Sequence, residues 1–161
     1  MPPEAAHTRW WQTFEVIVGL PVLVALALQW AVPLTLPAAP LTLAARGIGA
    51  LLLSAGVAVI GLARRELARH RQPTDPGQPT GQLVTSGVFS VSRNPLYLGG
   101  ILLLAGIALA VNLPWMGIML LPALVASHVV LVAPEERYLA RRFGADYADY
   151  AATVCRWLGR R

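Results

Sequence analysis

The residues best suited to chemistry lie in two short polar segments on either side of a long apolar stretch. The first segment is Arg93, Asn94, Pro95, Leu96 and Tyr97. Asn followed by Pro is typical of a helix start, because Asn caps free N–H groups and Pro fits the first helical position. The positive end of such a helix binds carboxylate or phosphate. We therefore predict an anion-binding helix start here, the alternative being an ordinary helix cap beside an arginine at a membrane boundary.

The second segment carries two adjacent carboxylates, Glu135 and Glu136, followed by Arg141, Arg142 and Tyr147. A carboxylate can accept hydrogen bonds from an ammonium or a sugar hydroxyl, or act as a general base. The arginines could neutralise and orient an anionic substrate, and an aromatic face such as that of Tyr147 attracts a cation. The structural alternative is an amphipathic helix on the membrane surface, with both acidic residues complementing its N-terminus.

Two other reactive side chains stand apart from these segments. His128 falls within the last apolar stretch, where polar groups usually face the bundle interior and find partners. We expect it to make a hydrogen bond within the bundle, with Ser127 as a neighbour, rather than to act in catalysis. Cys155 is the single cysteine of the chain, which excludes an intramolecular disulfide and a cysteine metal cluster. No metal site is predicted.

The composition indicates the element type that must position these residues. Hydrophobic residues make up 56% of the 161 residues and charged residues only 13%, whereas a soluble domain carries about 25% charge. This excludes disorder and an ordinary globular domain. The net charge of +5 could attract nucleic acid, but the high hydropathy favours an anionic membrane surface and no nucleic-acid partner.

We predict an all-α integral membrane protein with four transmembrane helices plus a C-terminal amphipathic cytoplasmic helical segment, in a single domain over residues 1–161. Apolar runs long enough to cross a hydrocarbon core of about 30 Å place the spans at about 16–36, 41–63, 95–112 and 114–133. Twelve of the 13 arginines fall on one side of these spans. The positive-inside rule then makes both termini cytoplasmic, in a plasma membrane that we expect to be bacterial.

Small residues recur at four-residue spacing in the second span, at Ala50, Ser54 and Ala58, with Gly49 and Gly56 nearby. Small side chains let membrane helices approach closely. They indicate either packing within the bundle or the seam of a homodimer, so the protein is expected to be a monomer or a homodimer.

Together the two polar segments resemble the isoprenylcysteine carboxyl methyltransferase family and its bacterial relatives. The family's first block matches Gly87, Phe89, Arg93, Asn94, Pro95, Tyr97 and Gly99. Its second block matches Glu135, Glu136, Leu139, Phe143, Gly144, Tyr147 and Tyr150, with Arg156 after it. The resemblance covers roughly residues 80 to 157. It departs at Asn94, where the best-known members have His, so a contact by an imidazole does not carry over.

The resemblance implies S-adenosylmethionine as methyl donor, held by residues 83–99 and 134–157 at the cytoplasmic membrane face. The cofactor-binding residues would be Arg93, Asn94, Pro95, Leu96, Tyr97, Glu136 and Tyr147. The residues implied near the acceptor, as catalytic residues, are Glu135, Glu136, Arg141 and Arg142. The acceptor would be lipidic or hydrophobic, and it could be a carboxylate. Two alternatives stay open: an NADPH-dependent membrane reductase of sterol-reductase-like architecture, and a non-catalytic membrane protein.

Overall fold

A computed structural model describes residues 13–36, 41–74 and 78–161. Over these residues the chain is helical and contains no strand, apart from one isolated bridge between Val154 and Arg160. The predicted all-α class is confirmed. The helices are α1 (Phe14–Ala31), α2 (Leu41–Arg69), α3 (Pro95–Ala110), α4 (Pro114–Ser127), α5 (Ala133–Phe143) and α6 (Ala145–Thr153), with a 3₁₀ turn η1 (Gly87–Ser90) and a π-helical turn η2 (His128–Val132).

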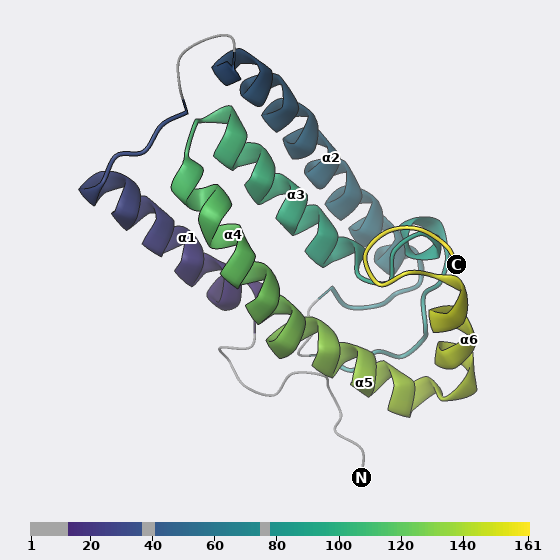
Figure 1. Ribbon diagram of the computed structural model, residues 1–161. Coiled ribbons are helices and arrows are strands. Elements are labelled where there is room, and N and C mark those ends of the chain that lie inside the picture. Colours follow the sequence, from purple (N-terminus) through teal and green to yellow (C-terminus); the bar gives the residue numbers. More distant parts are fainter. Residues whose placement is uncertain (1–12, 37–40, 75–77) are drawn as a thin grey trace.

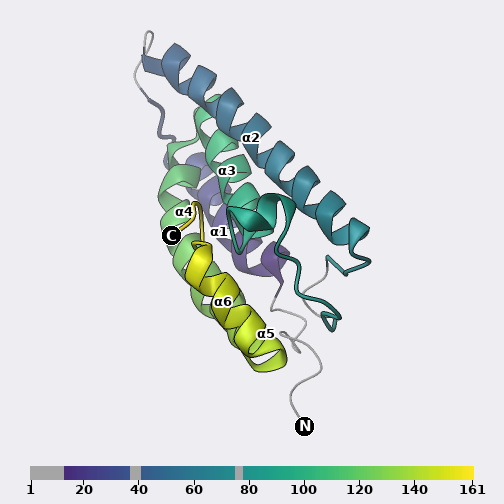
Figure 2. The same cartoon turned by 90° about the vertical axis from the view of Figure 1, so that its right-hand side faces the viewer.

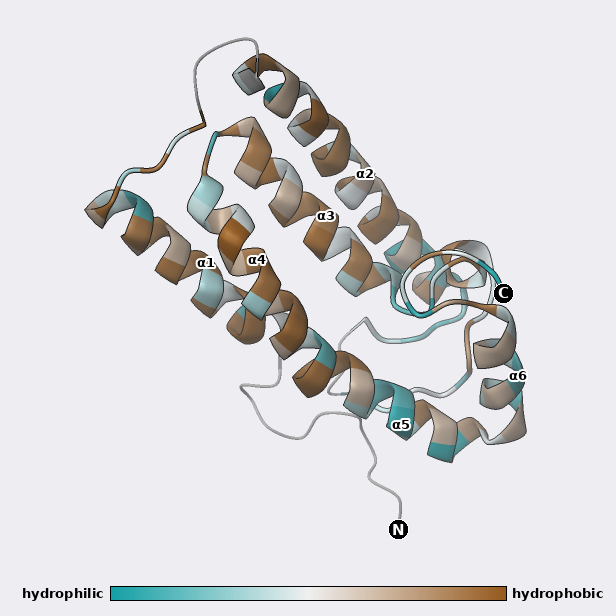
Figure 3. Cartoon of the chain, viewed as in Figure 1, coloured by the Kyte–Doolittle hydropathy of each residue, from teal (hydrophilic) through white to brown (hydrophobic). Residues whose placement is uncertain are grey.

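Helices α1 to α4 form a bundle in which α1 lies along α4 and α2 lies along α3 (Figure 1), while α3 and α4 join the two pairs. Figure 2 shows α5 and α6 at one end of this bundle, beyond the start of α3. Apolar residues dominate α1 to α4, and hydrophilic residues gather on α5 and near the chain end (Figure 3). Large apolar side chains such as Leu23, Leu51 and Val125 are exposed, as expected of a surface that contacts lipid.

Two helices of the described chain are long and apolar enough to cross a membrane, Thr42–Arg69 and Pro114–Phe143. The other apolar helices, Glu15–Ala31 and Pro95–Ala110, are shorter. Helix α1 ends at Ala31, before the predicted boundary at residue 36. Pro33 explains the earlier end, because the residue before a proline is held away from helical backbone angles, and Val32 accordingly has φ −135° and ψ 83°.

The turn between α3 and α4 lies where the Asn112-Leu113-Pro114 sequence predicts it. Asn112 adopts a left-handed backbone with φ 56°, a conformation that Asn tolerates better than most residues. Its side-chain Oδ1 accepts a hydrogen bond from the Leu36 N–H at 2.9 Å. Pro114 then takes a first-turn position of α4. This turn therefore also fixes the end of the segment that follows α1.

The fourth predicted span does not end at residue 133, because α4, η2 and α5 run on as one helix, Pro114–Phe143. In η2 the Ala133 N–H donates to the His128 carbonyl, five residues back. Pro134 accounts for this wider turn, since it has no N–H to donate and its ring would clash with the carbonyl four residues earlier. Glu135 and Glu136 therefore continue a helix, and the predicted free helix N-terminus beside them is wrong.

Helices α2 and α3 approach closely through glycines, among them Gly49 and Gly56 of the second predicted span. A Cβ atom on Gly106 would lie 2.5 Å from the Leu53 nitrogen and 2.8 Å from the Gly49 carbonyl oxygen. The stripe of Ala50, Ser54 and Ala58 is instead exposed. Packing within the bundle is therefore confirmed for Gly49 and Gly56 but not for Ala50, Ser54 and Ala58, whose use as a homodimer seam stays a prediction.

The close contact predicts a large difference between two glycines of this helix pair. Gly106→Ala should lower the free energy of unfolding by about 1–3 kcal/mol, because the atoms that meet the new methyl group belong to the backbone and cannot turn aside. Gly61→Ala in α2 meets nothing within 4 Å, so it should be neutral or stabilising. Thermal unfolding in detergent, followed by circular dichroism, compares the two. Equal effects would contradict the close backbone contact.

Candidate functional site

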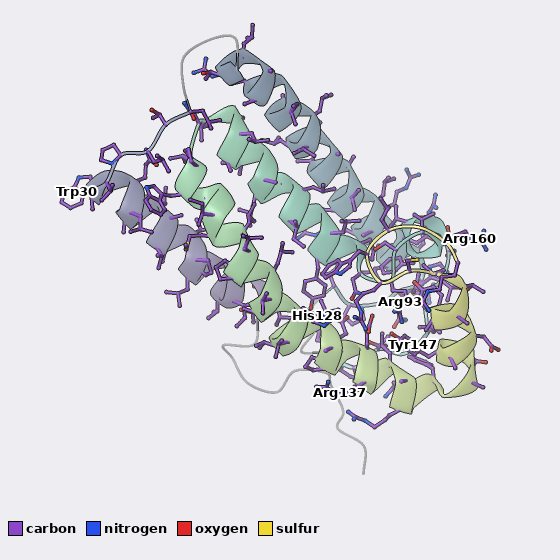
Figure 4. All side chains as sticks on the ribbon, viewed as in Figure 1. Trp30, Arg93, His128, Arg137, Tyr147 and Arg160 are labelled. Atoms are coloured by element: carbon purple, nitrogen blue, oxygen red, sulfur yellow. The ribbon has the colours of Figure 1, made fainter. Side chains whose placement is uncertain are left out.

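The two predicted polar segments meet at one end of the bundle. The start of α3 faces α5 and α6 there, and the chain after α6 turns back towards it (Figure 1). In Figure 4, Arg93 and Tyr147 lie close together in this region, whereas Arg137 lies on the outer side of α5. Most of the side chains that the sequence singles out are thus gathered in space, although they come from residues 93–97 and 135–147.

Arg93 lies at the centre of this group, and its side chain is only 9% exposed. One guanidinium nitrogen, Nη1, donates to the Tyr147 hydroxyl at 3.3 Å, and the other, Nη2, lies 3.4 Å from Oε1 of Glu136. The third nitrogen, Nε, is buried and has no hydrogen-bond partner among the described residues. A buried donor without a partner costs about 1–3 kcal/mol. Arg93 is thus held in place while its Nε–H has no partner and can bind a ligand.

Asn94 precedes α3 as predicted, and Pro95 takes a first-turn position. The expected side-chain cap is wrong, however, because the Asn94 side chain makes no capping hydrogen bond. Its Nδ2 donates instead to Oε1 of Glu136 and to the Arg156 carbonyl oxygen, each at 3.3 Å. The amide therefore links the start of α3 to α5 and to the end of the chain.

Glu136 is the anionic group that gathers the site. Its side chain is 12% exposed and accepts two hydrogen bonds from Nε of Arg156, at 3.0 and 3.1 Å, and one from Nη2 of the same arginine, at 2.7 Å. Together with the contacts to Arg93 and Asn94, these bonds use most of the acceptor positions of a carboxylate. The geometry therefore gives Glu136 the task of holding Arg93 and Arg156 in place.

Glu135 points to a different partner from its neighbour. Its Oε2 accepts a hydrogen bond from the Tyr97 hydroxyl at 2.9 Å. The Tyr97 ring is 9% exposed and packs with Leu131 and Val132 of η2. Pro95 is also buried, while Leu96, the remaining predicted residue of this segment, is partly exposed. The Tyr97–Glu135 bond therefore fixes the start of α3 against the long helix Pro114–Phe143.

The segment after α6, residues 154–161, forms what we call the C-terminal strap. The Cys155 carbonyl accepts a hydrogen bond from the Arg93 N–H at 3.2 Å, and the Gly159 N–H donates to the Val91 carbonyl at 2.7 Å. Within the strap, the Cys155 N–H donates to the Gly159 carbonyl at 2.9 Å. The strap thus binds the chain just before α3 through backbone groups.

Arg156 belongs to this strap, and the residue-by-residue prediction of the site did not include it. Helical periodicity could not identify Arg156, because α6 ends at Thr153 and the strap is not helical. The sequence signal for Arg156 was its position just after the second family block. The hydrogen bonds to Glu136 raise the pKa of Arg156 above its ordinary value, so this guanidinium stays charged.

Two tyrosines of α6 close the site on the side of the strap. Tyr147 and Tyr150 are 6% and 8% exposed, and their rings meet edge to face with centroids 6.2 Å apart. The Tyr150 hydroxyl donates to the Phe89 carbonyl at 2.7 Å, which connects α6 to η1. Burial raises the pKa of Tyr147 to about 12. Its hydroxyl therefore stays neutral and keeps a proton to donate while it accepts from Arg93.

Arg141 and Arg142 do not join this group. Both are exposed, on the last turn of α5. The Arg142 guanidinium lies 6.0 Å from the ring centroids of Tyr138 and of Phe143. A role for these two arginines in orienting an acceptor stays a prediction. Gly144, with φ 53°, follows them and separates α5 from α6, so the C-terminal helical segment consists of two short helices.

The fold and the site together define a helical membrane protein with a polar site at one end of its bundle, built around two arginines, two glutamates and three tyrosines. The chain belongs to the phospholipid methyltransferase family, whose model matches residues 44–146, more than half of the chain. This is the family of isoprenylcysteine carboxyl methyltransferase-like membrane methyltransferases, so the resemblance of the two polar blocks is confirmed. No curated protein and no solved structure matches the chain.

Family membership supports a membrane methyltransferase. The matched residues contain the start of α3 and the acidic pair of α5, and they end just before Tyr147. The C-terminal strap, with Arg156, lies beyond the match. Part of the site is therefore built from residues of this chain that the family match does not cover.

Proposed function

We propose that the protein transfers a methyl group from S-adenosylmethionine to a lipidic acceptor at the cytoplasmic face of the membrane. The observation that carries this proposal is the buried Arg93 guanidinium, whose Nε has no partner among the described residues. A carboxylate fits such a group, because charge-assisted hydrogen bonds to arginine are strong and directional. S-adenosylmethionine offers a carboxylate beside an ammonium, a ribose and an adenine.

The residues around Arg93 suit the rest of this donor. The Tyr147 hydroxyl keeps a proton to donate, and aromatic faces such as its ring attract a sulfonium. Glu136 holds Arg93 through the other terminal nitrogen, Nη2, which lies 3.4 Å from Oε1. When bound, the donor supplies a methyl group already activated on sulfur, so alignment and exclusion of water can carry most of the rate enhancement. A covalent enzyme intermediate is not required.

A lipidic acceptor suits the position of the site at the end of an apolar bundle. The charged donor would enter from water, because moving its charges through hydrocarbon is costly. An acceptor with an apolar tail can keep that tail in the bilayer and present its polar head to the site. If the acceptor is anionic, the exposed Arg141 and Arg142 are the proposed groups that neutralise and orient it.

Binding of the two candidate cofactors tests the proposal. Isothermal titration of the purified protein should detect S-adenosylmethionine and give no signal with NADPH. Binding of NADPH alone would favour the membrane reductase. Binding of neither would favour a non-catalytic membrane protein. Methyl transfer from radiolabelled donor to lipid extracts then tests turnover separately from binding.

We further propose that α1 to α4 all span the membrane, with both termini in the cytoplasm of a bacterial cell. The asymmetry of the arginines supports this topology. Reporter fusions at residue 40 and after Arg161 should report opposite sides of the membrane. Reporters on the same side, or a C-terminus outside the cytoplasm, would contradict it.

A further inference from the structure

His128 has a buried nitrogen that the proposed cofactor site does not use. Its Nδ1 is inaccessible to solvent and has no hydrogen-bond partner among the described residues. The hydrogen bond expected from the sequence is therefore not made, although Ser127 beside it is buried. Buried polar atoms in native structures nearly always have a partner, so an exception calls for a cause. A ligand that supplies the missing partner is one such cause.

His128 lies on the same long helix as the acidic pair, seven residues before Glu135. At 1.5 Å per residue this separation is about 10 Å along the helix, towards the apolar part of the bundle. Figure 4 shows His128 on the side of this helix that faces Arg93 and Tyr147. The next residue, Val129, is 59% exposed. His128 therefore lies between the polar site and a surface that lipid can reach.

The other two candidate bases of the site each have a polar side-chain partner. Glu136 is paired with two guanidinium groups, at 2.7 and 3.4 Å. Glu135 accepts the Tyr97 hydroxyl at 2.9 Å. An acceptor that carries an N–H or O–H must lose a proton when it is methylated. Of these three residues, His128 is the one with a buried nitrogen that has no hydrogen-bond partner among the described residues.

We propose that His128 binds the nucleophilic head of the methyl acceptor through Nδ1 and takes up its proton during methyl transfer. This inference rests on the proposed function and extends it from the donor to the acceptor. As the acceptor nitrogen or oxygen bonds to the methyl carbon, the carbon–sulfur bond breaks with its electron pair on sulfur. The proton displaced from the acceptor passes to Nδ1, and His128 becomes an imidazolium ion.

Histidine resonances of the whole protein in lipid nanodiscs give a readout that does not depend on turnover. Two bilayers are compared with S-adenosylhomocysteine present: phosphatidylcholine alone, and phosphatidylcholine with phosphatidylethanolamine of the same acyl chains. The His128 Nδ1 resonance should shift only with the ethanolamine lipid, which has N–H groups to donate. His70 is the internal control, because its Nδ1 already lies 2.9 Å from the Glu66 carbonyl oxygen. Equal His128 spectra in both bilayers would overturn the proposal.

Two variants separate this inference from the proposed function. His128→Phe keeps a ring but no nitrogen, and methyl transfer to phosphatidylethanolamine should fall at least 100-fold, within the usual range for loss of a general base. Affinity for S-adenosylmethionine should stay within threefold, which also shows that the variant is folded. His128→Asn offers a smaller replacement if the phenylalanine does not fit. Unchanged turnover in a folded variant would overturn the role of His128, whereas a wild-type protein that binds no donor would overturn the proposed function.

Discussion

Replacing Glu136 with alanine should lower the free energy of unfolding by about 3–5 kcal/mol, the usual cost of removing one partner of a buried ion pair. The effect is large because the carboxylate serves two arginines, and Arg93 is only 9% exposed. Without Glu136 the Arg93 charge stays buried without a counterion. Chemical denaturation in detergent measures the change.

Asp149→Ala is the matched control for Glu136→Ala. Asp149 is an exposed acidic residue of α6, so its loss should change the unfolding free energy by no more than about 0.5 kcal/mol. Glu136→Gln keeps a hydrogen-bond acceptor without the charge, so its unfolding free energy should lie between those of Glu136→Ala and Asp149→Ala. A Glu136→Ala protein as stable as the Asp149→Ala protein would show that the ion pairs do not hold the site together.

Replacing Arg93 with alanine should weaken S-adenosylmethionine binding by about 1.5–3 kcal/mol, as expected for the loss of a charge-assisted hydrogen bond. The expectation follows from the unpaired Nε and from the place of Arg93 between Glu136 and Tyr147. Arg93→Lys keeps the charge without the planar fork, so it should recover only part of the affinity. Isothermal titration provides the measurement.

Arg137→Ala controls for the loss of one positive charge, because Arg137 is exposed on the outer side of α5. The affinity of the Arg137→Ala protein for S-adenosylmethionine should stay within twofold of the wild-type value. The Arg93→Ala protein must also unfold cooperatively, since Arg93 is a partner of Glu136. An unchanged affinity in such a folded protein would remove Arg93 from the donor site.

The helical class and the start of α3 were predictable because they depend on local rules. An apolar run needs a helix to satisfy its backbone in lipid, and Asn94-Pro95 starts α3 as expected. The side-chain direction of Asn94 was not predictable, because its partners Glu136 and Arg156 lie 42 and 62 residues away in sequence. An Asn that caps a helix and an Asn that makes a long-range hydrogen bond look the same in the sequence, so the residue type alone does not distinguish them.

The π-helical turn and the C-terminal strap could not be predicted for a different physical reason. Pro134 is compatible with a new helix start as well as with a widened turn, and only packing decides between them. The strap bonds to residues 91–93 through backbone groups of Cys155 and Gly159, which are the same for almost any side chain. Periodicity therefore carries no information about it.

The strap also determines when the site can form as the chain is synthesised. Arg93 and Asn94 leave the ribosome long before Arg156 and Gly159, the residues that bond to their segment of the chain. A chain shortened before residue 154 could still carry every apolar helix into the membrane, yet its Glu136 would lack the Arg156 guanidinium. Assembly of the helices and completion of the site are thus separated in time: the lipid-facing bundle can form before residues 154–161 are made, whereas the Glu136–Arg156 ion pair forms only after them.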